Sequence, residues 1–305
     1  MKHRVTSSQR HRILLHIAIV ATLLTTGTAC EKSISPVEAP AGIGADPIEV
    51  TPEGVAAGLL TRINIGNNGI VQQISYNSRQ QPLVMTRYAG NLLTEKDSVI
   101  YNTTGKLQKI IHYTPDFFKK GKFTVSGNTT FEWNNNNKIV KKLFNDQESS
   151  TQEDTRYTYD ATGKVHTIST TTASKYDNLK VLTTLYYEQT NVVRITRSGN
   201  GQAISELTVI AVDGQQSYVT GSLLPYLLDI VENEAFSEQN ASETKNIQYV
   251  NFNNKRDTIV TITKNSFQYN TQKRPVKNTF TSTIYSPGNP KPVTSAATID
   301  YTYGK

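Results

Sequence analysis

Apolar and polar side chains alternate over most of the chain from Leu59 onward, in runs rich in Thr, Asn and Tyr. A period of two puts every second side chain on the same face of a strand, and residues of these types favour strands. Turn-forming residues separate the runs at short intervals. The pattern therefore predicts an all-β domain over residues 59–305, with a first strand at Leu59–Ile65 and a last strand at Ala297–Tyr303.

One hairpin pattern recurs around six large aromatic residues, which we call the anchors. Asn or Asp follows the anchor directly in five of the six units, and such side chains initiate turns. In four units the fourth residue after the anchor is Gly or Asn, which tolerates the positive φ of a hairpin bulge. Each unit therefore predicts a strand, a tight turn and a second strand. The anchors are Tyr76, Tyr101, Trp133, Tyr159, Tyr187 and Tyr269.

Apolar residues flank each predicted turn at fixed distances from the anchor. One stands two positions before it, on the same face of the strand, and an aliphatic residue returns six or seven positions after it. The preceding residues are Ile74, Val99, Phe131, Tyr157, Leu185 and Phe267, and the returning residues are Leu83, Leu107, Ile139, Val165, Val193 and Val276.

These hairpins predict one continuous sheet. An isolated hairpin is only marginally stable, so neighbouring units must pair edge to edge. A twisted sheet of more than about ten strands curls, splits or closes. We therefore expect an extended antiparallel sheet of consecutive hairpins, strongly curved or closed into a barrel, with the anchors on its inner face.

The gap between the fifth and sixth anchors spans 82 residues and interrupts the repeat. Within it, Ser222 can cap a helix whose first turn accepts Pro225, so we expect the one short helix of the domain at residues 223–236. Strand pattern returns over residues 247–263, with a turn at residues 253–254. The apolar stripe of the helix is Leu224, Leu227, Leu228, Val231 and Ala235.

The N-terminal residues predict export and membrane tethering. Met1–Ala29 places four basic side chains and no acid around the apolar run Ile13–Leu24, as in a signal peptide. Small residues lead from Gly27 to Cys30, which resembles the lipobox of bacterial lipoproteins, whose cysteine receives a diacylglycerol. We therefore expect Cys30 to be the lipid attachment site; an ordinary secretory signal that leaves a free thiol is the alternative. Residues 30–58, rich in Pro and Gly, are expected to form a flexible linker.

Charge and cysteine content exclude several function classes. Four of the 32 basic residues leave with the signal, so the remainder carries 28 against 25 acidic residues, a near balance that disfavours nucleic acid as a partner. A single cysteine excludes disulfides and cysteine metal sites. Only His112 and His166 follow the signal, too few for a standard zinc site without carboxylates. We expect no cofactor.

Three units carry a more specific resemblance. The segments YNTTGKLQKI from Tyr101, YDATGKVHTI from Tyr159 and YNTQKRPVK from Tyr269 resemble the tyrosine-aspartate hairpin repeats of Gram-negative surface lipoproteins. The layout of lipobox, linker, hairpins, late insertion and terminal strand is similar to domains of unknown function, one of them described as having a porin-like fold. The resemblance implies this architecture and an envelope location, and it brings no activity. Departures that leave the turn type open fall at Gln80, Glu188 and Lys273.

The strands do not predict a lipid-facing surface. Spanning strands of about 9 to 11 residues need an apolar outer row, and a lysine at the bilayer midplane costs about 2–4 kcal/mol. The faces opposite the anchors carry charged and hydroxyl side chains instead. We therefore expect a water-exposed domain tethered to the outer membrane, on either its periplasmic or its outer side. These polar residues are Lys106, Lys109, Lys138, Lys141, Thr170, Thr172 and Lys264.

No motif predicts catalysis. Both histidines lie in predicted strands among Lys and Thr, and no nucleophile-elbow motif occurs, so we interpret them as solvated strand residues. Paired carboxylates could act on glycosides, but the acids available are interpreted as solvated surface. They are Glu153 and Asp154 in a predicted loop, and Asp229, Glu232 and Glu234 on the predicted helix.

Two tripeptides resemble the acidic–Ser/Thr–aliphatic acceptor for O-glycosylation of exported proteins. They are centred on Ser98 and Thr258, which are therefore candidate glycosylation sites.

Two functions remain open from the sequence. The first is a non-catalytic envelope lipoprotein that serves as a binding or structural module for a glycan, a peptide or an outer-membrane protein. The second is a glycan-active enzyme that uses a carboxylate pair. The lack of any His, Cys or Gly-rich motif favours the first. The anchors are interpreted chiefly as core residues, with stacking on sugar rings as the alternative.

Overall fold

A computed structural model of the chain describes residues 58–304, apart from 67–68, 117–121, 148, 175–177, 220–221, 228–235 and 253–254. The expected signal peptide, Cys30 and nearly all of the expected linker lie outside the described residues.

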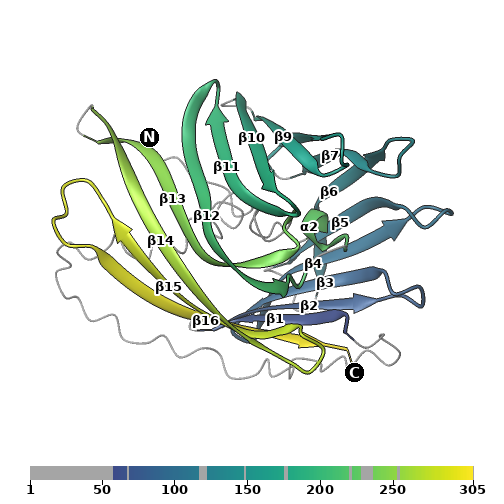
Figure 1. Cartoon of the computed structure of the whole chain (residues 1–305). Helices are drawn as coiled ribbons and strands as arrows, with labels where there is room; N and C mark the ends of the chain where they lie inside the picture. The colour runs from purple at the N-terminus through teal and green to yellow at the C-terminus, as the bar shows by residue number, and fades with distance from the viewer. Residues whose placement is uncertain are drawn as a thin grey trace, which may run out of the picture. The chain divides into compact units, whose positions relative to one another are not determined.

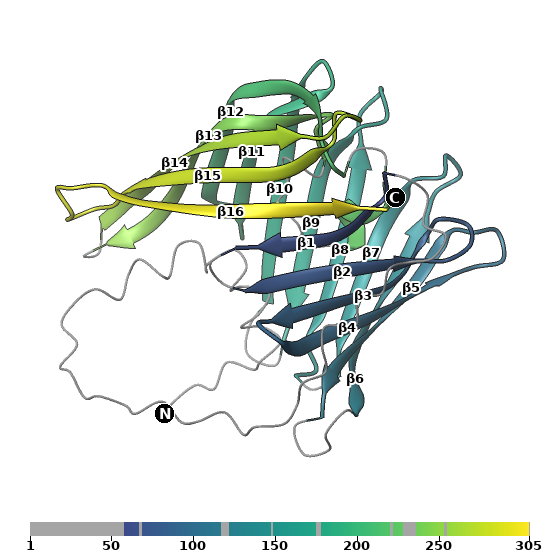
Figure 2. The same cartoon turned by 90° about the horizontal axis from the view of Figure 1, so that it is seen from below.

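The described residues form one closed antiparallel barrel of sixteen strands (Figure 1). Each strand pairs with the strands before and after it in the chain, and β1 pairs with β16 to close the wall (Figure 2). The expected sheet of consecutive hairpins is confirmed, and of the two forms expected, strongly curved or closed, the structure shows the closed one. The strands are β1 Leu60–Ile65, β2 Ile70–Tyr76, β3 Pro82–Ala89, β4 Leu92–Tyr101, β5 Leu107–Pro115, β6 Phe123–Trp133, β7 Ile139–Asp146, β8 Gln152–Tyr159, β9 Val165–Ala173, β10 Asn178–Glu188, β11 Asn191–Gly199, β12 Gln202–Gln216, β13 Gln239–Phe252, β14 Lys255–Tyr269, β15 Pro275–Tyr285 and β16 Val293–Tyr303.

A hydrophobic core fills the barrel at the end where the six anchor hairpins turn. Leu107 and Leu185 are 0% exposed, and the first five anchors pack against this core. The residues two positions before the anchors are buried in five units, and Phe267 is half-buried. Alternation along the strands therefore places the core where the sequence predicts it.

The returning residue is mispredicted in three hairpins. Leu83 is 42% exposed, whereas Pro82 beside it is buried. Tyr76 pairs with Pro82 and Ser75 with Val84, so Leu83 is the extra residue of a β-bulge. The same shift buries Val192 in place of Val193 and Pro275 in place of Val276.

Five of the six turns share one geometry. In the unit of Tyr101, the side-chain Oδ1 of Asn102 accepts hydrogen bonds from the amides of Thr104 at 3.0 Å and Lys106 at 2.9 Å, and Gly105 has a φ of +80°. Gln80 and Lys273 adopt φ of +60° and +59°, so these departures from the repeat keep its turn. The unit of Tyr187 differs, because Glu188 pairs with Asn191 across a two-residue turn in which Gln189 has a φ of +53°.

Of the expected helix at residues 223–236, the structure describes residues 223–227 and 236. Helix α2, Leu224–Leu227, begins with the Leu224 amide donating to Ser222 Oγ at 3.2 Å, which confirms the expected cap. Leu224 and Leu227 are buried in the barrel core, and Figure 1 shows α2 surrounded by the wall. Leu228, Val231 and Ala235 of the expected stripe lie outside the described residues. The later hairpin is confirmed, because Phe252 pairs with Lys255 across residues 253–254.

Replacing Asn102 with Ala is expected to lower the free energy of unfolding by about 1–3 kcal/mol, because the turn loses the acceptor of several hydrogen bonds. Urea unfolding measures the change. The neighbouring Thr103→Ala removes an exposed side chain and should change the stability by less than about 0.5 kcal/mol. Equal effects of the two variants would contradict the role of Asn102.

The one aspartate turn is expected to respond to acid. Hydrogen bonds from the Lys164 amide and then from Thr162 hold the pKa of Asp160 below its ordinary value. A lowered folded-state pKa stabilises the protein above about pH 4, the ordinary Asp value, and this contribution is lost as the pH falls below that. Asp160→Asn should therefore match the wild type at pH 7 and lose less stability at pH 3. Parallel urea midpoints of the two proteins over this range would refute the prediction.

Candidate functional site

The anchors join neighbouring hairpins at one end of the barrel, which we call the turn rim. In five of the six anchors the side chain donates to the backbone carbonyl of the first residue in the neighbouring strand, so the polar atom is satisfied. Burial raises the pKa of the anchor tyrosines well above the ordinary value, so they remain protonated donors. The bonds are Tyr76 to Leu60 at 2.6 Å, Tyr101 to Pro82 at 2.9 Å, Trp133 to Leu107 at 2.8 Å, Tyr159 to Ile139 at 2.5 Å and Tyr187 to Val165 at 2.8 Å.

One further tyrosine makes the same hydrogen bond as the five anchors, and the sixth anchor makes a different one. Tyr303, at the end of β16, donates to the Pro275 carbonyl at 2.8 Å in the same way, although it lies outside the six-unit pattern. The sixth anchor, Tyr269, donates instead to the carboxylate of Asp213 and accepts from Asn240. The Tyr269 hydroxyl reaches Asp213 of β12 across β13, the strand that lies between β12 and β14.

Basic side chains cover the anchor rings. The fifth residue after one anchor lies over the ring of the next: the Lys138 Nζ is 4.9 Å from the Tyr159 ring centre, and the Lys164 Nζ is 5.3 Å from that of Tyr187. Both ammonium groups also donate to the next turn, at the carbonyls of Gly163 and Gln189. The same contact is made by a neutral side chain at Gln81, whose Nε2 donates to the Gly105 carbonyl at 2.8 Å.

A pocket opens where the turn rim meets the insertion between β12 and β13. It encloses about 360 Å³, and we call it the rim pocket. Aromatic rings, two lysines and two asparagines line it, and its lining includes no carboxylate among the described residues. Its size and mixture of apolar and polar groups are those of a small-molecule site. The lining is Trp133, Asn136, Asn137, Lys138, Ile139, Tyr159, Gly163, Lys164, Val165, Tyr187, Leu223, Tyr226 and Phe236.

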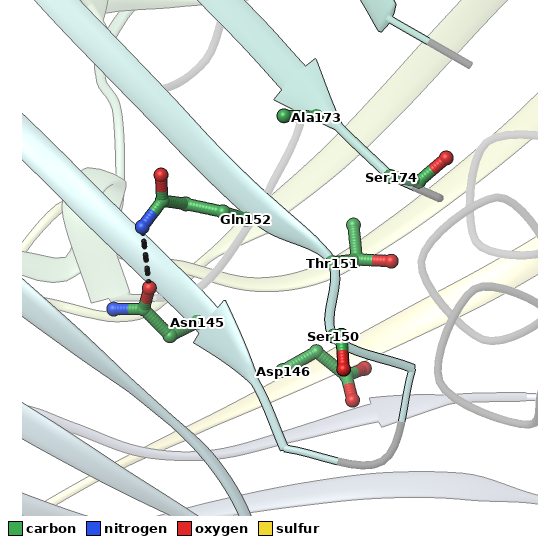
Figure 3. Close-up of a pocket in the computed structure, with 7 residues that line it drawn as sticks. All are labelled: Asn145, Asp146, Ser150, Thr151, Gln152, Ala173 and Ser174. Carbon is green, nitrogen blue, oxygen red and sulfur yellow. Dashed lines mark hydrogen bonds between the residues drawn. The ribbon is translucent and has the colours of Figure 1, made fainter. Parts of the chain in front are cut away.

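A second pocket, of about 450 Å³, lies at the other end of β7, β8 and β9 (Figure 3). Its polar lining has no aromatic ring, and Gln152 donates to Asn145 at 2.8 Å within it. Its one carboxylate, Asp146, is buried and accepts a hydrogen bond from the Ser149 amide at 2.9 Å. We assign this carboxylate to holding the β7–β8 connection.

His112 lies inside the barrel, not in solvent as expected from the sequence. Its Nδ1 is 2.7 Å from Asp97 Oδ1, and its Nε2 is 2.8 Å from Thr129 Oγ1. Asp97 and His112 are directly paired across β4 and β5, so their side chains must share the inner face. The sequence pattern missed this because the three partners come from three strands.

The order of carboxylate, imidazole and hydroxyl resembles a hydrolase triad, but the hydroxyl is buried, while the His112 and Asp97 side chains are 16% and 24% exposed. Thr129 is 3% exposed, and neither described pocket reaches any of the three residues. Phe144 packs edge-on against the imidazole, with ring centres 5.5 Å apart. The three side chains therefore serve to fix the strand alignment of β4, β5 and β6. His166, by contrast, is exposed as expected.

The candidate carboxylate pair is not brought together. Glu153 and Asp154 are successive residues within β8, not in a loop, so they point to opposite faces. Asp154 lies on the outer face, where its carboxylate bonds Arg156 at 3.2 Å. The other candidates, Asp229, Glu232 and Glu234, lie outside the described residues.

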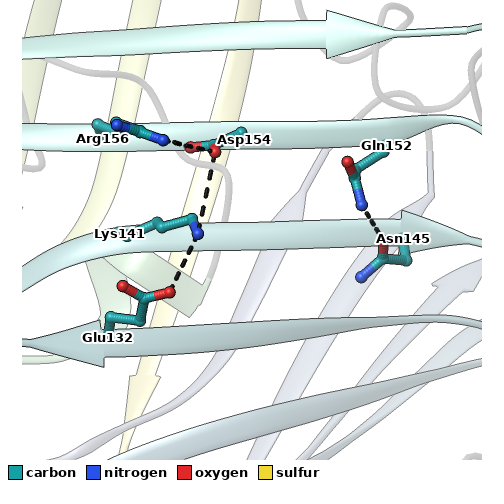
Figure 4. A network of polar contacts seen from close by, with 6 residues as sticks. All are labelled: Glu132, Lys141, Asn145, Gln152, Asp154 and Arg156. Atoms are coloured by element: carbon teal, nitrogen blue, oxygen red, sulfur yellow. Dashed lines mark hydrogen bonds and ion pairs between the residues drawn. The ribbon is translucent and has the colours of Figure 1, made fainter.

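The outer wall of β6, β7 and β8 carries a chain of ionic contacts (Figure 4). Lys141 lies 3.0 Å from Glu132 on one side and 4.0 Å from Asp154 on the other, and Asp154 in turn contacts Arg156. Glu132 is 64% and Arg156 69% exposed. These four residues form what we call the ionic chain.

Several expected outer residues lie elsewhere. Thr170 shares the inner face with buried Thr155, to which its hydroxyl bonds at 3.1 Å, and Thr172 has the same parity as Thr170. Lys106 and Lys138 sit in turns over anchor rings. Lys109 and Lys264 keep the outer position, because they neighbour inward-facing residues.

The structure describes both candidate O-glycosylation sites, and their modification remains a prediction. Ser98 is partly exposed on the outer face of β4, opposite in orientation to Asp97. Thr258 is partly exposed in β14, and its amide donates to Asp257 at 2.7 Å. Cys30 lies outside the described residues.

Among the described residues, no cluster of three or more His, Cys, Asp or Glu side chains is arranged to hold a metal ion. Within the same ranges, no helix has the length and apolar character needed to cross a membrane.

Thr129→Val is expected to lower the free energy of unfolding by about 1–3 kcal/mol, because the buried imidazole of His112 loses a partner while the side-chain volume is kept. The matched control is Thr130→Val, which changes the partly exposed neighbour on the outer face and should have little effect. Urea unfolding compares the two, and a larger effect at Thr130 would be inconsistent with a structural role for the triad-like residues.

Comparison with known proteins supports the fold. No protein-family profile and no curated protein matches the sequence. A porin-like protein from Bacteroides uniformis is similar in structure, with a TM-score of 0.50 and 10% identity over 81% of this chain and 98% of that one. A porin-like protein from Bacteroides vulgatus gives 0.47 and 12% over the same shares. At such identity the likeness concerns the fold alone: this chain forms a closed barrel that is similar in fold to the porin-like protein from B. uniformis.

Proposed function

We propose that the protein is a non-catalytic barrel of the cell envelope, tethered by a lipid on Cys30, whose outer wall contacts water and which binds a small ligand at the rim pocket. The ionic chain on the outer wall is the observation that supports this proposal most directly. The likeness to a Bacteroides porin-like protein is consistent with an envelope location.

The ionic chain argues against a lipid-facing wall. Lys141 forms ion pairs with Glu132 and Asp154, which lie on the two adjacent strands, as exposed charges do in water. In hydrocarbon a lysine at the midplane of a barrel wall costs about 2–4 kcal/mol, and an exposed Arg156 would add a similar amount. The buried apolar residues gather inside the barrel, whereas Ile100, Leu182 and Tyr186 are among the exposed apolar side chains. An apolar core inside the wall is the reverse of the arrangement in a membrane barrel, which is polar inside and apolar outside.

The described chemistry supports binding more than catalysis. The hydroxyl of Thr129 is buried next to His112, and Glu153 and Asp154 face opposite ways. A glycosidase needs two carboxyl groups about 5 to 9.5 Å apart across one site. The rim pocket, which is lined by aromatic rings and lysines, instead has the composition of a recognition site.

Cys30→Ala tests the tether and the water-facing wall together. The full chain is expressed with its signal in a Gram-negative host, and its distribution between membranes and the aqueous phase is measured. Wild type should sediment with membranes and be extracted by detergent, because two or three acyl chains anchor stably. The variant should be released without detergent.

Ser33→Ala, close to the same cysteine, serves as the control and should remain membrane-bound. A Cys30→Ala protein that still required detergent would indicate a membrane-embedded wall and contradict the proposal. Finding the wild-type protein in the aqueous phase would contradict the proposed lipid tether.

A further inference from the structure

We propose that the rim pocket binds a sugar ring that carries a carboxylate, of the uronic acid class. This inference rests on the proposed binding role and names the chemistry of the ligand.

Positive charge in the pocket has no described counter-charge. Lys138 and Lys164 line it, and neither ammonium lies within ion-pair distance of a carboxylate among the described residues. Each ammonium carries three hydrogens and donates one to a turn carbonyl. The remaining donors can bind an anionic group, and a charge-assisted hydrogen bond to a carboxylate is the strong form of that contact.

The rest of the lining suits the body of a sugar. Trp133, Tyr159 and Tyr187 come from three consecutive hairpins, and Tyr226 and Phe236 face them from the insertion. Because lysines lie over the three anchor rings, Tyr226 and Phe236 provide the apolar ring surface for the C–H face of a pyranose. The side chains of Asn136 and Asn137 add amide donors and acceptors for hydroxyl groups.

These aromatic groups are held in place without a ligand. The Tyr226 ring packs edge-on against Tyr157, with centres 5.4 Å apart, and against Phe236 at 6.1 Å. The hydroxyl of Tyr159 is fixed by the Ile139 carbonyl. A preformed site of this kind loses little side-chain entropy on binding.

Size and composition together exclude simpler ligands. A volume of about 360 Å³ is near the lower limit of ligand sites, enough for one or two sugar rings. An inorganic anion would leave the apolar ring surface without a partner, and a neutral glycan would give neither ammonium group an anionic partner.

The hydrogen bond between neighbouring turns does not require the positive charge of a lysine. Gln81 makes the same turn-to-turn hydrogen bond with a neutral amide. Lys106 lies over the Trp133 ring, with its Nζ 5.8 Å from the ring centre, yet it is not part of the pocket lining. Lys138→Gln and Lys164→Gln can therefore keep the structural bond while they remove the charge, and Lys106→Gln is a matched control.

The chain offers a direct readout of binding. Trp133 is its single tryptophan and lines the pocket, so its fluorescence reports ligand entry. The full-length lipoprotein in detergent is titrated with a galacturonic acid disaccharide, with the matching neutral galactose disaccharide and with sodium sulfate. Calorimetry repeats each titration, because Lys106→Gln alters the surroundings of Trp133. Thermal unfolding checks that each variant is folded.

The acidic disaccharide should bind wild type at least tenfold more tightly than the neutral one or sulfate. Each pocket variant should weaken binding by about tenfold to a hundredfold, the loss of one charge-assisted hydrogen bond, while Lys106→Gln stays within about twofold. Equal affinity for the neutral disaccharide would overturn the ligand class and leave the binding role standing. If Lys106→Gln lost as much affinity for the acidic disaccharide as the pocket variants, or if no saccharide bound, the assignment to this pocket would be overturned. The membrane distribution of Cys30→Ala tests the proposed lipid tether separately.

Discussion

A hydrogen bond from an anchor side chain to the backbone of the neighbouring strand holds the turn rim together. Tyr101, for example, belongs to one hairpin by sequence but donates to Pro82 in the preceding one. Because the donor is buried, it must find an acceptor, and the carbonyl at the start of the neighbouring strand is the group in reach. The contact recurs around the rim, so the hairpins cannot splay apart there. Tyr303 extends it to the last strand, next to the seam at which β16 meets β1.

The polarity of the wall follows from where the core lies. A sixteen-strand barrel is wide, and in porins its interior is filled with water. Here the interior at the turn rim is apolar and includes Leu224 and Leu227 of the insertion. The apolar side of every strand in this region must then face inward, and alternation sends charged residues such as Lys141 outward. Further along the same inner surface the side chains become polar, and His112 joins Asp97 and Thr129 there.

The rim pocket arises from the combination of a repeat and an exception. In four of the six turns the repeat combines an aromatic anchor, an Asn or Asp after it, and a basic side chain that lies over the next aromatic ring of the rim. The insertion between β12 and β13 then brings Tyr226 and Phe236 against the turns of Trp133 and Tyr159. The turn rim, whose side chains elsewhere only join neighbouring hairpins, therefore forms a concave pocket beside the insertion.

Local pattern was sufficient to predict the hairpins, because alternation and turn chemistry act between residues close in sequence. It identified the anchors, the asparagine turns such as that of Asn102, and the buried face. It misplaced Leu83, because Pro82 takes the buried position six residues after the anchor that Leu107 holds in its own unit. Closure of the wall, the partners of His112 and the rim pocket depended on contacts between distant strands. Those were decided only by the tertiary structure, because a buried polar or aromatic group takes its partner from whichever strand the closed sheet brings beside it.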